Sequence, residues 1–362
     1  MLGLTCFGDV YRGKRVLLTG HTGFKGSWLA LWLHELGAKV TGVALSPDAQ
    51  PNHWDLLSQP MDDRRLDIRD AHALLKIFGE TRPEIVFHLA AQPLVRRSYQ
   101  DPLETWSTNV MGTVNVLEAC RQTPSVRAIV AITTDKCYEN LEWPWGYREN
   151  DRLGGHDPYS ASKAGAELVA ASYRSAFFHT ATAPLVATAR AGNVIGGGDW
   201  SDDRLIPDLV RALEKNISLE IRSPYATRPW QHVLESLSGY LLLGQKLVIG
   251  DKSFAEAWNF GPEREGNRTV SDVLSELSRQ WQTMLWHVTD KPQPHEANLL
   301  YLDSAKAQSR LGWKPVWDLE TTLKRTADWY RAWLEDSNVI SRQQLAAFVK
   351  AAEGANIEWA LS

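Results

Sequence analysis

Cysteine is scarce in this chain of 362 residues, and its scarcity excludes one class of protein. The three cysteines, Cys6, Cys120 and Cys137, lack the short spacings of metal-binding clusters. We therefore expect no disulfide framework, no metal site and a reducing compartment such as the cytoplasm. Cys137 stands beside charged residues, so a reactive thiol at this position stays an alternative.

Long apolar runs and a strong net charge are absent as well. No segment approaches the roughly 20 apolar residues that a membrane span requires. The first fifteen residues carry an acid inside their apolar part and their basic residues after it, which is the wrong order for a signal peptide. The formal net charge of -4 gives no general attraction to nucleic acid or to anionic membranes. We expect a cytoplasmic globular protein that binds neither.

Apolar segments of strand length alternate with amphipathic segments of helix length in the first half of the chain. The expected strands are residues 14–20, 39–45, 83–91, 126–134 and 185–196, and the expected helices are residues 27–37, 71–80, 109–122 and 160–177. Strands that are apolar along their whole length are typical of a sheet covered on both faces. The alternation predicts an α/β fold, a Rossmann-type doubly wound parallel sheet.

Glycine, aspartate, proline and tryptophan become more frequent past the last of these strands, and shorter strands and helices are expected to mix there. We expect residues 1–192 and 234–260 to form the sheet domain, and residues 193–233 and 261–335 to form a smaller mixed lobe. Residues 336–362 are expected to be a C-terminal tail with one weakly amphipathic helix.

The segment TGHTGFKG follows the first expected strand directly and opens the first expected helix. It carries Gly20, Gly23 and Gly26, and glycine is needed where a turn is tight and where backbone approaches a pyrophosphate closely. The start of the helix then offers free N–H groups and the positive end of its dipole to an anion. In this setting the pattern predicts a dinucleotide site.

The second expected strand does not decide which dinucleotide binds. Ser46 stands near the place of the acid that usually holds the adenosine ribose, Asp48 comes slightly later, and no arginine there requires a 2′-phosphate. Asp67 has two interpretations: its carboxylate receives the adenine amino group, or it caps the helix that follows.

Five polar residues, Thr134, Asp135, Lys136, Tyr159 and Lys163, are expected to meet in this fold. The first three follow a buried strand, and the carboxyl ends of strands face the ligand crevice of a doubly wound sheet. An i, i+4 spacing places Tyr159 and Lys163 on one face of the next helix. A phenol with a pKa near 10 is a poor base at pH 7, but ammonium and nicotinamide cations nearby lower that pKa. Tyr159 then accepts a proton from a sugar hydroxyl as hydride leaves the same carbon.

Seven motifs in order resemble those of the extended short-chain dehydrogenase/reductase family: TGHTGFKG, FHLAAQPLV, TNVMGT, TTDKCYEN, DPYSASKAGAE, RAGNVIGGGDW and LDSAKAQSRLGW. The resemblance runs from Gly13 to about Glu335 and is most detailed to the nucleotide-sugar 4,6-dehydratases that act on CDP-glucose. It implies NAD as the cofactor, CDP-glucose as the small-molecule substrate bound by the smaller lobe, and a role in dideoxysugar and O-antigen (lipopolysaccharide) biosynthesis.

The resemblance also implies the mechanism of a hydro-lyase. Tyr159, with Thr134 and Lys163, oxidises carbon 4 of the sugar, and the resulting ketone acidifies the proton on carbon 5. Water leaves across carbons 5 and 6 with Asp135 as the acid, and hydride returns to carbon 6 to give CDP-4-dehydro-6-deoxy-D-glucose. Related dTDP-glucose dehydratases have a glutamate base where this chain has Lys136. Lys136 is either a neutral base or an electrostatic stabiliser of the enolate.

The binding positions of the family carry over to two groups of residues. Those expected to hold the cofactor, besides Tyr159 and Lys163, are Gly20, Thr22, Gly23, Phe24, Lys25, Gly26, Asp67, Ile68, Leu89, Ala90, Ala91 and Thr108. Those expected to hold the substrate are Gln92, Arg97, Asn193, Arg204, Arg222 and Arg228. Arginine suits a diphosphate because its planar fork donates two parallel hydrogen bonds.

Two rival functions share many of these features. A nucleotide-sugar 4-epimerase, or a 4,6-dehydratase for another nucleotide sugar, uses the same glycine loop, Tyr159 and Lys163, although an epimerase needs no acid such as Asp135. A non-catalytic NAD-sensing protein has the same fold but no reason to keep the catalytic residues together.

Assembly and cofactor retention complete the expectations. Residues 109–120 and 160–173, rich in small and apolar side chains, are expected to pair with their twofold copies in a four-helix bundle, giving a homodimer or a tetramer. The bulk of His21 and Lys25 in the glycine loop, together with the missing ribose acid, predicts weak retention of NAD, which His21→Gly is expected to improve.

Overall fold

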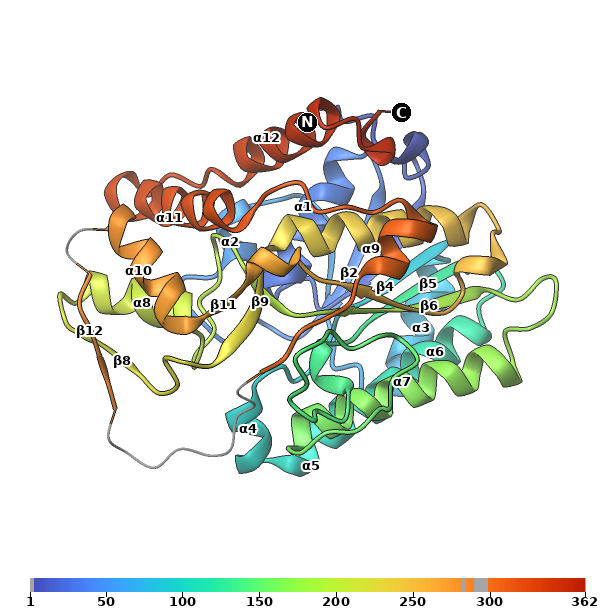
Figure 1. Cartoon of the computed structure of the whole chain (residues 1–362). Helices are drawn as coiled ribbons and strands as arrows, with labels where there is room; N and C mark the ends of the chain where they lie inside the picture. Colours follow the sequence, from blue (N-terminus) through green and yellow to red (C-terminus); the bar gives the residue numbers. More distant parts are fainter. Residues whose placement is uncertain (1–2, 282–283, 290–298, 362) are drawn as a thin grey trace.

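Seven parallel strands form the central sheet of the computed structural model (Figure 1), which describes residues 3–281, 284–289 and 299–361. They are β1 (Arg15–Thr19), β2 (Lys39–Ala44), β3 (Asp62–Arg65), β4 (Ile85–His88), β5 (Ala128–Ile132), β6 (Leu185–Ala191) and β10 (Ala257–Phe260). Their order across the sheet is β10-β6-β5-β4-β1-β2-β3, so the direction of winding reverses between β1 and β4. The predicted doubly wound parallel sheet is confirmed.

Helices cover both faces of this sheet (Figure 1). One face carries α1 (Phe24–Glu35) and α9 (Val233–Val248), and the other carries α3 (Ala71–Thr81), α6 (Gly112–Arg121) and α7 (Pro158–Ala176). Successive residues of a strand therefore enter two different cores. In β1, Val16 and Leu18 pack into the core beneath α1 and α9, whereas Leu17 packs into the core beneath α3 and α6.

Short helical elements lie between or beside the longer ones, and apart from η2, which overlaps the helix expected at residues 109–122, the sequence did not predict them. They are η1 (Phe7–Asp9), α2 (His53–Leu57), α4 (Val95–Gln100), α5 (Pro102–Trp106), η2 (Ser107–Met111), η3 (Asp135–Cys137), η4 (Lys252–Phe254), η5 (Arg264–Gly266), η6 (Ala307–Leu311) and η7 (Glu358–Ala360). No helix within the described ranges is both long enough and apolar enough to cross a membrane.

A second group of strands lies beyond the carboxyl ends of the main sheet. It contains a three-stranded sheet β11-β9-β7 and a two-stranded sheet β12-β8. The elements are β7 (Asn193–Ile195), α8 (Leu205–Glu214), β8 (Leu219–Ile221), β9 (Thr227–His232), β11 (Asn267–Thr269), α10 (Val270–Gln280) and β12 (Trp286–Val288). Residues 282–283 and 290–298 of the expected smaller lobe lie outside the described residues.

The single strand expected at residues 185–196 is in fact two strands in two sheets, so that prediction was wrong. β6 pairs with β5 in the main sheet, and β7 pairs with β9. The break falls at Gly192, where an added Cβ would lie 2.4 Å from the ring of Pro229. Glycine has no side chain, so the backbone can pass close against β9 at this point. There the chain leaves the main sheet and enters the smaller one.

The tail is ordered against the sheet domain. α11 (Leu319–Asp336) leads into α12 (Ser341–Gly354), and Phe348 of α12 meets Trp32 of α1 with ring centroids 5.8 Å apart. Trp359 stacks on Phe7 at 5.0 Å, so the two ends of the chain lie side by side (Figure 1). The helix whose role the sequence left open therefore buries the outer face of α1.

Candidate active site

A crevice of about 890 Å³ opens at the carboxyl ends of the sheet strands and extends into the smaller group of strands. It includes the turns after β1 and β4, where the winding of the sheet reverses and where doubly wound sheets bind their ligands. All the cofactor and substrate residues predicted from the sequence line this crevice. Thr134, Lys136, Tyr159 and Lys163 also line it, whereas Asp135 is completely buried next to them.

The glycine loop has the shape of a phosphate cradle. Gly20 has a φ of +77°, and a Cβ there would lie 2.7 Å from the amide nitrogen of Ala90. A Cβ on Gly26 would lie 2.0 Å from the carbonyl oxygen of Gly20, so the start of α1 touches the loop directly. Gly23 is the N-cap of α1 and brings no side chain to the first-turn N–H groups. These residues fit the pyrophosphate of a dinucleotide.

His21 lies away from the crevice. Its ring is completely buried, with Nε2 3.0 Å from Asp63 Oδ1 and its centroid 4.7 Å from that of Trp54. A Cβ on Gly42 would lie 2.5 Å from His21 Nδ1, so the ring fills the space beside β2. The expectation that His21 obstructs the pyrophosphate was therefore wrong, and His21→Gly would remove core packing instead.

Lys25 extends from the glycine loop toward α9. Its Nζ lies 3.5 Å from the hydroxyl of Tyr240, a residue that the sequence motifs did not indicate. Burial, with a further contribution from the positive charge of Arg204, lowers the pKa of Lys25 to about 7. An amine that is only partly charged at neutral pH therefore stands between the cradle and the catalytic residues.

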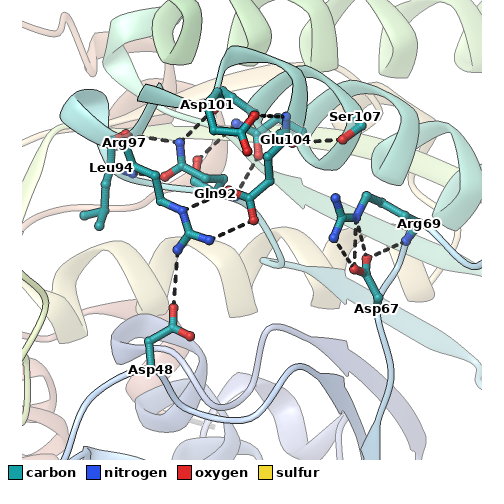
Figure 2. A network of polar contacts seen from close by, with 11 residues as sticks. Asp48, Asp67, Arg69, Gln92, Leu94, Arg97, Asp101, Glu104 and Ser107 are labelled. Carbon is teal, nitrogen blue, oxygen red and sulfur yellow. Dashed lines mark hydrogen bonds and ion pairs between the residues drawn. The ribbon is translucent and has the colours of Figure 1, made fainter. Parts of the chain in front are cut away.

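The adenosine end of the crevice contains Ser46, Asp48 and Asp67. Arg69 donates two hydrogen bonds to the Asp67 carboxylate, with Nε and Nη2 at 2.9 and 2.6 Å from Oδ2 (Figure 2). This hydrogen bonding by Arg69 holds the pKa of Asp67 below its usual range. The N-cap of α3 is Asp70, which accepts from the amide of Ala73 at 3.0 Å. The interpretation of Asp67 as the helix cap was therefore wrong.

Arg97 lines the crevice, but its guanidinium is already engaged (Figure 2). Nε and Nη2 donate to the Glu104 carboxylate at 2.8 Å each, and Nη1 lies 3.7 Å from Asp48 Oδ2. The Gln92 amide likewise bonds to the backbone of Leu94, with Oε1 accepting from N at 2.6 Å. In this geometry both side chains organise the α4–α5 segment, and the substrate role predicted for them stays a prediction.

Other arginines surround the part of the crevice between the two groups of strands. Arg204 contacts Asp199 at 3.0 Å, and Arg222 contacts Asp203 at 3.1 Å. Arg96 was not among the predicted substrate residues, although its neighbour Arg97 was. Arg96 also contacts Asp203, at 3.2 Å. Arg228 lies on β9 and is buried, and Asn193 begins β7. The cluster brings several positive charges to one region, as an anionic substrate requires.

Thr134 and Asp135 form a close pair at the end of β5. Thr134 is the N-cap of η3, and its hydroxyl donates to Asp135 Oδ1 at 2.9 Å. Lys136 Nζ lies 3.6 Å from the same oxygen. Asp135 Oδ2 is buried and has no hydrogen-bond partner among the described residues.

Tyr159 and Lys163 lie on the first two turns of α7, where Asp157 caps the helix by accepting from the amide of Ser160. Burial raises the pKa of Tyr159 to about 12, against the hydrogen bond from Thr134 that lowers it. Burial lowers the pKa of Lys163 to about 8, and its Nζ donates to the carbonyl of Ile132 at 3.3 Å. The protein alone therefore does not make Tyr159 a base.

The alternative of a reactive thiol at Cys137 loses support here. Cys137 is completely buried, and burial raises the pKa of its thiol, so it has the properties of an inert core residue rather than a reactive one. Within the described ranges no cluster of three or more His, Cys, Asp or Glu side chains has the arrangement of a metal site.

Known proteins share this architecture. Among solved structures, dTDP-glucose 4,6-dehydratase from Streptomyces venezuelae, with NAD and TYD bound, superposes with a TM-score of 0.74 at 25% identity and covers 88% of this chain and 97% of that one. UDP-glucose 4-epimerase from Thermotoga maritima, with UDP-glucose, has a TM-score of 0.77 at 23% identity, covers 89% of this chain and all of the other, and shows the fold alone.

Sequence relatives agree with the structural ones. CDP-glucose 4,6-dehydratase from Salmonella typhimurium is 49% identical over 352 residues, which cover 95% of this chain and 98% of the relative. dTDP-glucose 4,6-dehydratase from Shigella flexneri is 27% identical, covering 89% and 95% of the two chains. The family model described as GDP-mannose 4,6 dehydratase matches residues 17–326. The resemblance seen in the sequence is confirmed, and the chain belongs to the GDP-mannose 4,6 dehydratase family.

Proposed function

We propose that this protein catalyses the NAD-dependent dehydration of CDP-D-glucose to CDP-4-dehydro-6-deoxy-D-glucose. The observation that carries the proposal is 49% identity to a CDP-glucose 4,6-dehydratase over 95% of this chain. The crevice supports it because Thr134, Tyr159 and Lys163 lie in the same cavity as the glycine cradle. We further propose a cytoplasmic location, from the scarcity of cysteine, and a role in dideoxysugar and O-antigen biosynthesis, from the resemblance.

The two parts of the crevice suit the two ligands. Residues 1–192 and 234–260 supply the cradle for NAD, which when bound accepts hydride from the sugar and later returns it. Residues 193–233 and 261–335 supply Asn193, Arg204, Arg222 and Arg228 toward the nucleotide sugar. We assign the diphosphate to this group of arginines, with Arg96 and the predicted Arg97 also lining the crevice.

Oxidation at carbon 4 needs a base at the sugar hydroxyl, and Tyr159 is the phenol that lines the crevice beside Lys163. A hydrogen bond between Thr134 and Tyr159 lowers the pKa of Tyr159 against the effect of burial. Lys163 adds a positive charge on the same helical face while it stays protonated. Tyr159 accepts the hydroxyl proton, and its neighbours keep the phenolate aligned.

Elimination needs an acid at the carbon 6 hydroxyl, a base that accepts the carbon 5 proton, and stabilisation of the negative charge that develops at carbon 5. Asp135, when protonated at Oδ2, the oxygen with no hydrogen-bond partner among the described residues, would donate that proton to the departing hydroxyl. Lys136 Nζ lies 3.6 Å from Asp135 Oδ1, beside the acid. As a neutral amine Lys136 would accept the carbon 5 proton, and as an ammonium it would stabilise the enolate.

We also propose that the protein is a homodimer. Large apolar side chains are exposed on α5, η2 and α7, which pack beside one another. They are Leu103 (81% exposed), Trp106 (42%), Met111 (53%) and Leu168 (61%), together with Phe177 (46%), the residue that follows the end of α7. A twofold pairing of this face would bury them in a bundle of helices.

Incubation with several nucleotide sugars tests the proposal. With NAD present, CDP-glucose should lose one water, and the product should absorb strongly in alkali, as keto-deoxy sugars do. A 4-epimerase would change the sugar without changing its mass, so mass spectrometry separates the two functions. Conversion of dTDP-, UDP- or GDP-sugars in preference to CDP-glucose would assign the enzyme to another substrate.

A further inference from the structure

One buried ion pair has no place in the mechanism above. Arg190 of β6 donates from Nη2 to Glu167 Oε2 of α7 at 2.8 Å, and both side chains are only 3% exposed. Such a pair is costly to bury and is not by itself evidence of added stability. Its surroundings indicate what it does.

Glu167 lies on the catalytic face of α7. Tyr159, Lys163 and Glu167 follow one another at intervals of four residues, which places them in one row along the helix. Glu167 Oε1 accepts from the hydroxyl of Thr133 at 2.5 Å, and Oε2 accepts from that of Thr188 at 2.7 Å. Because Thr133 immediately precedes Thr134, Glu167 ties the catalytic helix to the strand end that carries the other catalytic residues.

The charge of Glu167 acts on Lys163. Burial raises the pKa of Glu167, but the Arg190 charge and the hydrogen bonds from Arg190, Thr133 and Thr188 outweigh burial and hold this pKa below its usual range. Glu167 is therefore a carboxylate at neutral pH. Its charge raises the pKa of Lys163 against burial, which still lowers it to about 8.

The other groups that face Lys163 do not replace this charge. Cys137 of η3 keeps its proton, because burial raises the pKa of its thiol. His88 of β4 is neutral, because burial lowers its pKa to about 3. Lys25 of α1 is only partly charged at neutral pH, because burial lowers its pKa to about 7, and that charge has the same sign as the charge of Lys163.

We propose that Glu167, held in place by Arg190, is a positioning residue that keeps Lys163 protonated and fixes Thr133 and Thr134 against Tyr159. The inference rests on the proposed function, because it assigns Lys163 to the oxidation of carbon 4. Arg190 in turn is held by Tyr138, whose hydroxyl accepts from Nη1 at 2.7 Å, so the network extends from β6 to the segment after η3.

The test compares Glu167→Gln with Glu167→Asp through the pH dependence of kcat/KM for CDP-glucose. The contribution of Lys163 is present below its pKa and is lost as pH rises through about 8. Without the carboxylate that pKa falls, so E167Q should move the alkaline limb to lower pH by about one unit. E167D keeps the charge but shortens the reach to Thr133, so it should lower the rate and leave the limb in place. Both variants retain Lys25, so its titration cancels in the comparison.

A second variant and a second measurement keep the test decisive if E167Q does not fold. E167Q leaves Arg190 buried without a partner, whereas Glu167→Gln with Arg190→Met removes both charges and should fold. Competitive labelling of Lys163 with acetic anhydride, followed by peptide mass spectrometry, reads the same titration without turnover. An unchanged alkaline limb and labelling midpoint in a folded variant would overturn the inference. A wild-type enzyme that does not convert CDP-glucose would instead overturn the proposed function, and the labelling comparison would still decide the inference.

Discussion

Replacing Tyr159 by phenylalanine removes a single oxygen atom from the crevice and leaves the ring in place. The side chain is 8% exposed, so its ring packing should be retained in the variant. The substitution breaks the hydrogen bond between Tyr159 and Thr134, and breaking it costs about 1 kcal/mol of stability. Thermal unfolding should therefore change little, and binding of the nucleotide sugar should be nearly normal.

Catalysis should suffer far more than stability. Burial raises the pKa of Tyr159 to about 12, so at pH 8 the protein alone holds the phenolate in about one molecule in ten thousand. Positive charge beside the phenol increases that fraction, and the general base that results is worth about 100-fold to 10,000-fold in rate. Tyr159→Phe should therefore raise the barrier to carbon 4 oxidation by about 2.7 to 5.4 kcal/mol.

The assay follows the pH dependence of product formation and of reduced cofactor in a single turnover. In the wild type the rate should rise with pH as Tyr159 loses its proton and fall as Lys163 is deprotonated near its pKa of about 8. The residual activity of Tyr159→Phe should lack the rising limb. Near-normal turnover, or a slow variant that keeps the full rising limb, would show that another group is the base.

Three further substitutions test other parts of the site. Asp135→Asn should stop the loss of water while hydride transfer at carbon 4 continues, so reduced cofactor should accumulate; a normal yield of product would remove Asp135 from the role of acid. Gly26→Ala places a Cβ 2.0 Å from a backbone carbonyl of the glycine loop and should abolish NAD binding in calorimetry, whereas Gly79→Ala on α3 meets nothing within 4 Å and should bind normally. Leu168→Glu should give a monomer in sedimentation, whereas Ile249→Glu, on the other side of the sheet and 63% exposed, should not; a monomeric wild type would contradict the dimer.

The parts of the fold that the sequence predicted are those where burial leaves a strong pattern. β1, β4 and β5 are covered on both faces, so their apolar runs are nearly continuous. β3 was missed because its four residues, Asp62–Arg65, are all charged and exposed. It joins the edge of the sheet through backbone pairing with β2, and such an edge strand has no side-chain pattern from which it could be predicted.

In the candidate site, too, some features were predictable from the sequence and others were not. Motif spacing and the rule that ligands bind at the carboxyl ends of strands were enough to bring Gly20, Thr134 and Tyr159 into one crevice. The direction of an individual side chain was not predictable in this way. His21 turns toward Asp63, which is 42 residues away, and Arg97 bonds to Glu104 of the next helix, and motif spacing reveals neither partner.

The central claim is that this crevice removes water from CDP-glucose. The most direct measurement is mass spectrometry of the nucleotide sugar after incubation of the purified protein with NAD and, in parallel, CDP-, dTDP-, UDP- and GDP-sugars. We expect loss of one water from CDP-glucose at a higher kcat/KM than from the others, and no such loss with Tyr159→Phe on the same timescale. A CDP-glucose sample that keeps its mass, or faster dehydration of another nucleotide sugar, would contradict this claim.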